Sequence, residues 1–145
     1  MTKMSHRFRI KNKNLEEARE ALFDLKKFPK SFSEVFEIKN IKFPPQLSVG
    51  CKVSMNLKKF GISAESEYEV IELSQNKLAY KQSLGIMRKW THTMTLKEEN
   101  GTVELTDDIL YEVPYGLIGH LANDLFLRTE VPNMLYKRLK YLKLK

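Results

Sequence analysis

The sequence lacks several features on which whole classes of protein depend. Cys51 is its one cysteine among 145 residues, which excludes an internal disulfide and suits a reducing compartment. The six glycines stand singly, so no glycine-rich loop can cradle a phosphate, and no Gly-x-Ser-x-Gly segment offers a nucleophile elbow. Apolar runs are too short to span a bilayer, and residues 1–14 lack the apolar stretch of a signal peptide. We therefore predict a cytoplasmic protein.

The composition is that of a folded domain. Hydrophobic residues make up 42% and charged residues 30% of the chain, and there is neither an internal repeat nor a low-complexity linker. We predict one domain over residues 1–145, without a cofactor, as a monomer or a homodimer.

The net charge of +7 gathers partly near the C-terminus, where residues 128–145 are rich in Lys and Arg. No nucleic-acid motif accompanies these cations, so we predict no nucleic-acid partner. Two interpretations stay open: a solvated helix face, or docking on an anionic membrane. The docking cations would be Lys137, Arg138, Lys140, Lys143 and Lys145.

The first third of the chain predicts a strand, a helix and a second strand. Residues 6–12 alternate between apolar and polar, which is typical of a half-buried strand. Asn14 followed by Glu17 resembles a capping box, and the helix that follows is limited by Pro29. A second strand is predicted over residues 31–41.

The rest of the chain predicts an antiparallel meander and a long helix. Alternating segments separated by turns predict strands within 51–57, 66–73, 77–84, 87–96 and 102–113. Helical periodicity resumes at Leu117 and could run to the C-terminus, with a break or kink at Pro132. The order predicts an α+β fold in which this helix covers one face of a curved sheet. A cavity between them would suit a small molecule.

Residues 78–120 carry a family likeness. The matching positions are Gln82, Gly85, Trp90, His92, Gly101, Thr102, Asp107, Tyr111, Pro114 and Gly116. Together they resemble the SRPBCC or START-like superfamily, and within it the polyketide cyclase/dehydrase-like and ligand-binding members. Ile86 and Met87 depart from the Pro-Phe that is common there. The resemblance implies a helix-grip fold with a hydrophobic cavity, and relatives that bind lipids, hormones, polyketides or quinones, or in a few cases catalyse cyclisation or dehydration.

His92 is the residue whose role is most open. Trp90, His92 and Met94 share one face of a predicted strand, and Asp107 should face His92 from the next strand. The pair could belong to a buried polar network with Gln82, could orient a ligand, or could act as a catalytic acid–base pair. Catalysis requires a His92 nitrogen that is open to substrate.

The other candidates are the residues expected to line the cavity. We predict ligand contacts, on the inner face of the sheet and on the last helix, from Met55, Tyr68, Tyr80, Gln82, Trp90, His92, Met94, Asp107, Ile109, Tyr111, Leu121 and Leu125. A metal site is not predicted, because His6, His92 and His120 lie on three different elements and Cys51 is the only thiol.

Overall fold

The computed structural model describes residues 2–33, 36–59, 62–113 and 120–145, and for residues 59, 62 and 120–126 the backbone alone. In chain order the elements are β1 (Thr2–Lys11), α1 (Leu15–Leu22), the short 3-10 helix η1 (Lys30–Phe32), β2 (Glu37–Lys42), β3 (Lys52–Lys59), β4 (Ile62–Leu73), β5 (Lys77–Leu84), β6 (Lys89–Glu99), β7 (Thr102–Glu112) and α2 (His120–Tyr141).

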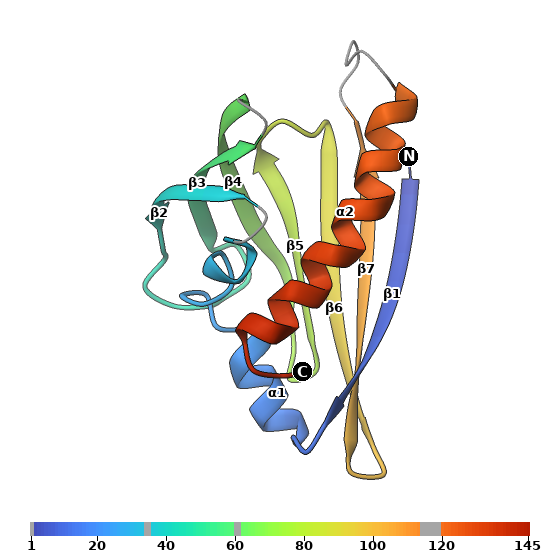
Figure 1. The fold of residues 1–145 in the computed structure, drawn as a ribbon. Helices are drawn as coiled ribbons and strands as arrows, with labels where there is room; N and C mark the ends of the chain where they lie inside the picture. Colours follow the sequence, from blue (N-terminus) through green and yellow to red (C-terminus); the bar gives the residue numbers. More distant parts are fainter. Residues whose placement is uncertain (1, 34–35, 60–61, 114–119) are drawn as a thin grey trace.

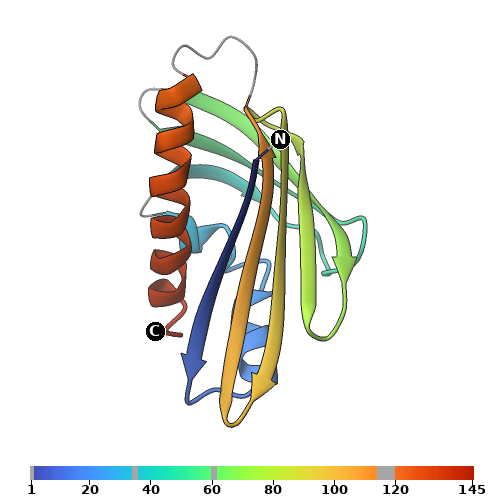
Figure 2. The same cartoon turned by 90° about the vertical axis from the view of Figure 1, so that its right-hand side faces the viewer.

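The strands form one antiparallel sheet in the order β1-β7-β6-β5-β4-β3-β2. The sheet curves, and α2 runs across its concave face, as the two views in Figures 1 and 2 show. The short helix α1 lies near one end of this layer (Figure 1). The arrangement confirms the predicted α+β fold and places the inner face of the sheet against a single long helix.

The start of α1 follows the prediction and its end does not. Asn14 accepts the backbone N–H of Glu17, and the Glu17 carboxylate accepts that of Asn14, which is the predicted capping box. The helix ends at Leu22, well before Pro29. Asp24 stops it, because its carboxylate accepts the backbone N–H of Lys26 and its carbonyl accepts that of Phe28.

The strand predicted over residues 31–41 is wrong in its first half. Pro29 opens η1, and the Ser31 hydroxyl donates to the Phe28 carbonyl at 2.6 Å. These local bonds favour a helical turn, and they bury Phe32 against the inner face. Extended pairing begins only at Glu37, in β2. The alternation of serine and aromatic residues in this segment imitates a strand.

Of the predicted break or kink at Pro132, the break is wrong, since α2 continues through this residue to Tyr141. Proline cannot donate the backbone bond of a helix interior, which weakens a helix locally. Packing compensates for this loss. Val131, Met134, Leu135, Arg138 and Leu139 are buried at the spacing of one helix face.

The core consists of two neighbouring clusters. The first is tightly closed and includes Ile10, Leu22, Met94 and Leu96, none more than 1% exposed. The second lies under α2 and is built around Ile109, Tyr111, Val131 and Leu135. Partly buried apolar side chains surround the second cluster: Met4, Phe36, Ile38, Met87, Trp90, Val113 and Leu127.

Candidate functional site

The hairpin of β6 and β7 brings His92 and Asp107 together as predicted. Trp90, His92 and Met94 share the inner face of β6. In the register, His92 lies opposite Ile109 and Met94 lies opposite Asp107, so His92 and Asp107 are diagonal neighbours. The His92 ring reaches across, and its Nε2 lies 2.7 Å from Asp107 Oδ1.

These two residues are the middle of a longer buried network. The Tyr80 hydroxyl, on β5, lies 2.6 Å from His92 Nδ1. On the far side, Arg138 of α2 donates from Nη1 to Asp107 Oδ1 at 2.8 Å and from Nη2 to Oδ2 at 2.7 Å. His92 is 1% exposed and both Asp107 and Arg138 are 0% exposed. The network therefore joins three strands to the C-terminal helix.

The charges in this network determine which of its groups carry protons. Burial alone would raise the pKa of Asp107, but the charge and hydrogen bonds of Arg138, helped by His92, hold that pKa well below its usual range. An ionised Asp107 only accepts, so His92 donates from Nε2. Burial raises the pKa of Tyr80 well above its usual value, so its hydroxyl stays protonated where it meets His92 Nδ1. The His92 ring is thereby held between the Asp107 carboxylate and the Tyr80 hydroxyl.

Both nitrogens of His92 are engaged by protein groups. The acid–base alternative requires one nitrogen open to substrate, and this geometry does not meet that requirement. The arrangement corresponds to the buried polar network, with different partners than predicted. Gln82 is not part of it, because its Nε2 instead donates to the Met87 carbonyl at 2.6 Å.

Arg138 corrects the predicted membrane surface. It was counted among the docking cations, but its guanidinium is fully buried on Asp107 and cannot reach a lipid headgroup. Sequence reasoning missed its role, although Arg138 shares the helical spacing of Val131, Leu135 and Leu139. Lys140 and Lys145 remain at the surface, with their ammonium groups 5.9 Å and 5.6 Å from the Tyr136 ring.

On the inner face of β5 and β6, side chains become more exposed toward the end that carries Gln82 and Trp90. Along β6, Leu96, Met94 and His92 are at most 1% exposed, whereas Trp90 on the same face is half-buried. Along β5, Leu78 and Tyr80 are buried and Gln82 is half-buried. The apolar wall is therefore least covered near Trp90.

Aromatic rings line the inner face beside the network. Tyr80 makes edge-to-face contacts with Tyr68, at 5.6 Å between centroids, and with Phe28, at 5.0 Å. Phe28 in turn contacts Phe32 in the same way, at 5.2 Å. The sequence prediction included Tyr68 and Tyr80 but not the two phenylalanines, because Phe28 lies in the stretch before Pro29 that was assigned to the first helix and Phe32 lies in a predicted strand.

Comparisons with known proteins bear on the fold. No family model matches the chain, and neither does any curated protein. Among solved structures, a START superfamily protein from Mycobacterium smegmatis superposes with a TM-score of 0.73 at 17% identity, over 94% of this chain and 93% of that one. Ginseng major latex-like protein 151 from Panax ginseng gives 0.64 at 14% identity, over 97% and 94%.

A third structure, the di-domain ARO/CYC StfQ from the steffimycin biosynthetic pathway, gives a TM-score of 0.76 at 12% identity. It covers 97% of this chain, which spans about half (49%) of StfQ. The chain has the START-like helix-grip fold. This confirms the resemblance seen in residues 78–120 at the level of the fold.

Within this START-like fold, the predicted ligand residues divide by burial. Met55, Tyr80, Met94, Ile109 and Tyr111 are buried, with His92 and Asp107 in the network, while Tyr68, Gln82 and Trp90 are half-buried. The structure brings all ten to the inner side of the sheet, except that Gln82 turns its amide to the loop after β5. The side chains of Leu121 and Leu125 lie outside the described residues.

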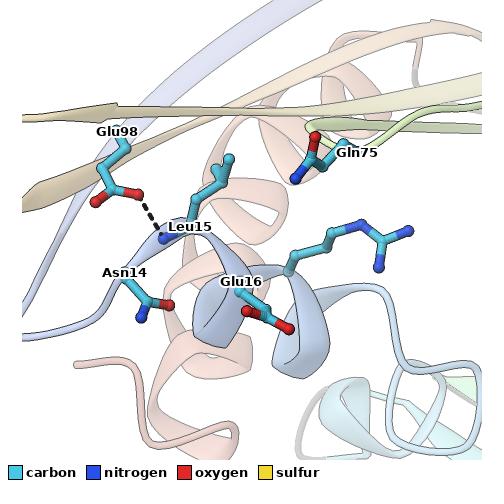
Figure 3. Close-up of a pocket in the computed structure, with 6 residues that line it drawn as sticks. Asn14, Leu15, Glu16, Gln75 and Glu98 are labelled. Atoms are coloured by element: carbon cyan, nitrogen blue, oxygen red, sulfur yellow. Dashed lines mark hydrogen bonds between the residues drawn. The ribbon is translucent and has the colours of Figure 1, made fainter.

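The START-like fold also carries a polar pocket at its other end (Figure 3). It is lined by Asn14, Leu15, Glu16, Arg19, Gln75 and Glu98. Glu98 accepts the backbone N–H of Leu15 at 2.8 Å, so a protein carboxylate already occupies the N-terminus of α1. Trp90 and Glu98 are eight residues apart on β6, about 26 Å along an extended strand. The pocket is therefore separate from the apolar wall.

Neither a metal-binding cluster nor a membrane-spanning helix occurs among the described residues. Over residues 2–33, 36–59, 62–113 and 120–145, no three His, Cys, Asp or Glu side chains form a group that could hold a metal ion. Within the same ranges, no helix combines the length and the apolar character needed to cross a bilayer.

Proposed function

We propose that this protein binds a hydrophobic or amphipathic small molecule between the inner face of the sheet and α2. The observation that supports the proposal is the loss of cover along a single strand face, from fully buried Met94 to half-buried Trp90. Apolar surface exposed on an inward face is unfavourable in water, and a ligand that covers it gains about 25 cal/mol per Å². The START-like neighbours make this role plausible.

The proposed contacts are the predicted ones, in two groups. Trp90, Tyr68 and Gln82 would touch the ligand, together with Leu121 and Leu125 from α2. The more deeply buried Met55, Tyr80, Met94, Ile109 and Tyr111 would form the base of the site. His92 and Asp107 would support that base without reacting. The cytoplasmic location, the single domain and the choice between monomer and homodimer stay predictions, as does membrane docking through Lys137, Lys140, Lys143 and Lys145.

Native mass spectrometry of gently purified protein tests the proposal. We expect a co-purified adduct, and a raised Tm with members of a library of lipids and aromatic compounds. Val113→Trp places an indole among the partly buried side chains that, like Trp90, pack against the second core cluster, and it should abolish both signals. Leu110→Trp places the same group on the outer face, where Leu110 is 39% exposed, and should retain both. Absence of adduct and of any thermal shift in the unmodified protein would refute ligand binding.

A further inference from the structure

The charged groups under α2 neutralise one another. Asp107 and Arg138 form a two-point ion pair, and the His92 ring lies between Asp107 and Tyr80. Arg138 is thus a buried cation whose Nη1 and Nη2 both donate to a protein carboxylate, while its Nε has no partner among the described residues. An anionic ligand placed nearby would meet the negative charge of Asp107 without a free counter-ion from this pair.

The raised pKa values of Tyr68 and Tyr80, on the same wall, indicate that negative charge is unfavourable in this region. Burial raises the pKa of Tyr68 to about 12, and burial together with the neighbouring Tyr68 raises that of Tyr80 further. A phenolate is disfavoured here because the charge loses its hydration. A carboxylate carried in by a ligand would suffer the same loss at the same place.

We propose that this site selects neutral ligands and rejects ionised carboxylates of the same shape, because Arg138, the buried cation among its described residues, is already paired with Asp107 and the rest of the described wall is mostly aromatic and aliphatic, with the uncharged amide of Gln82. The inference rests on the proposed function and specifies the class of ligand. The pKa of Tyr68 is raised from 10.0 to about 12, and two pKa units correspond to a factor of about one hundred in an equilibrium constant. We therefore expect about hundredfold weaker binding of the acid than of the matching alcohol.

The chain carries its own reporter for the test. Trp90 is the only tryptophan, and it is half-buried on the inner face, so its fluorescence should change when a ligand enters. Two matched pairs serve as probes: hexadecanol with palmitic acid, and pyrenemethanol with pyrenecarboxylic acid. Methyl esters of both acids restore neutrality at nearly the same shape. Titrations at about pH 8 keep the acids ionised.

The outcomes separate the two proposals. Binding of an alcohol and its ester with about hundredfold weaker binding of the acid supports neutral selectivity. Binding of the acid as tightly as the alcohol overturns it while leaving the ligand-binding proposal intact. Binding of no probe from either pair, together with the absence of a co-purified adduct, overturns both.

A variant of the wall tests the cause. Met87→Lys brings an ammonium group to the half-buried margin next to Trp90, in a loop where the fold should tolerate it. It should raise acid affinity about tenfold or more and leave alcohol affinity nearly unchanged. Met87→Leu is the neutral control and should keep the selectivity of the unmodified protein. Equal acid affinity in the Lys and Leu variants would show that charge does not set the selectivity.

Discussion

Arg138 on α2 and Asp107 on β7 are joined by two hydrogen bonds of 2.8 and 2.7 Å inside the protein, with both side chains fully buried. This is a direct polar link between the C-terminal helix and the sheet. It fixes the rotation of α2, because only one helix face can present Arg138 to β7. The apolar residues of that face are then directed at the inner wall.

A double-mutant cycle should show strong coupling between these two residues. Arg138→Met alone and Asp107→Asn alone each leave one buried charge without its partner, and we expect each to cost about 3–5 kcal/mol of unfolding free energy. The double variant removes both charges and keeps an oxygen that accepts from His92, so it should cost clearly less than the sum. Urea denaturation measures all four proteins. Additive losses would contradict the coupling.

The network also predicts loss of stability in acid. The pKa of Asp107 is depressed in the folded state, so its contribution is complete above the unfolded-state value of about 3.9 and is lost as pH falls below it. The urea midpoint should therefore decrease from about pH 5 downward. The double variant Asp107→Asn, Arg138→Met lacks this group and should show a shallower decrease. An equal decrease of the urea midpoint with falling pH in the two proteins would contradict this prediction.

Much of the fold could be predicted because its strands alternate and its turns are short. The strands within 77–84 and 102–113 were located nearly to their bounds, since one face of each is buried. The β6–β7 register was less certain. Asn100 and Gly101, both with positive φ, form its two-residue turn and pair Met94 with Asp107.

Within the buried polar network, only the central pair of His92 and Asp107 could be predicted from the sequence. His92 and Asp107 share a hairpin, so local spacing brings them together. Tyr80 was found as a residue of the inner face, but its bond to His92 depends on the β5–β6 register. Arg138 lies on a helix distant in sequence, and its basic neighbours resemble a solvated surface. Its partner follows from the packing of α2 against the sheet, which no local pattern encodes.

Removal of the Tyr80 hydroxyl should destabilise the protein more than its size suggests. Tyr80→Phe leaves His92 Nδ1 buried without a donor, which we expect to cost about 1–3 kcal/mol. Tyr141→Phe is the matched control, because Tyr141 is 44% exposed, and it should stay within about 0.5 kcal/mol. Thermal and urea unfolding provide the comparison. Equal effects of the two substitutions would show that the Tyr80–His92 bond contributes little.

Gly85 should be needed for its lack of a side chain. A Cβ at this position would collide with the amide of Gln82, whose Nε2 holds the Met87 carbonyl. Gly85→Ala should therefore cost about 1 kcal/mol and alter Trp90 fluorescence. In a Gln82→Ala background the same substitution should cost less, because the colliding group is gone and only the strain of the positive φ at residue 85 remains. A cost that is unchanged in that background would point to a cause other than Gln82.

Alkaline titration should distinguish Tyr68 from the surface tyrosines. Burial raises its folded-state pKa to about 12, whereas an unfolded tyrosine ionises near 10. Because the folded state holds its proton longer, the stabilising contribution is complete below about pH 10 and is lost as pH rises toward 12. Tyr68→Phe should remove this part of the alkaline decrease in the urea midpoint. A tyrosinate difference spectrum between the unmodified protein and Tyr68→Phe whose midpoint lies near pH 10 would contradict the raised pKa of Tyr68.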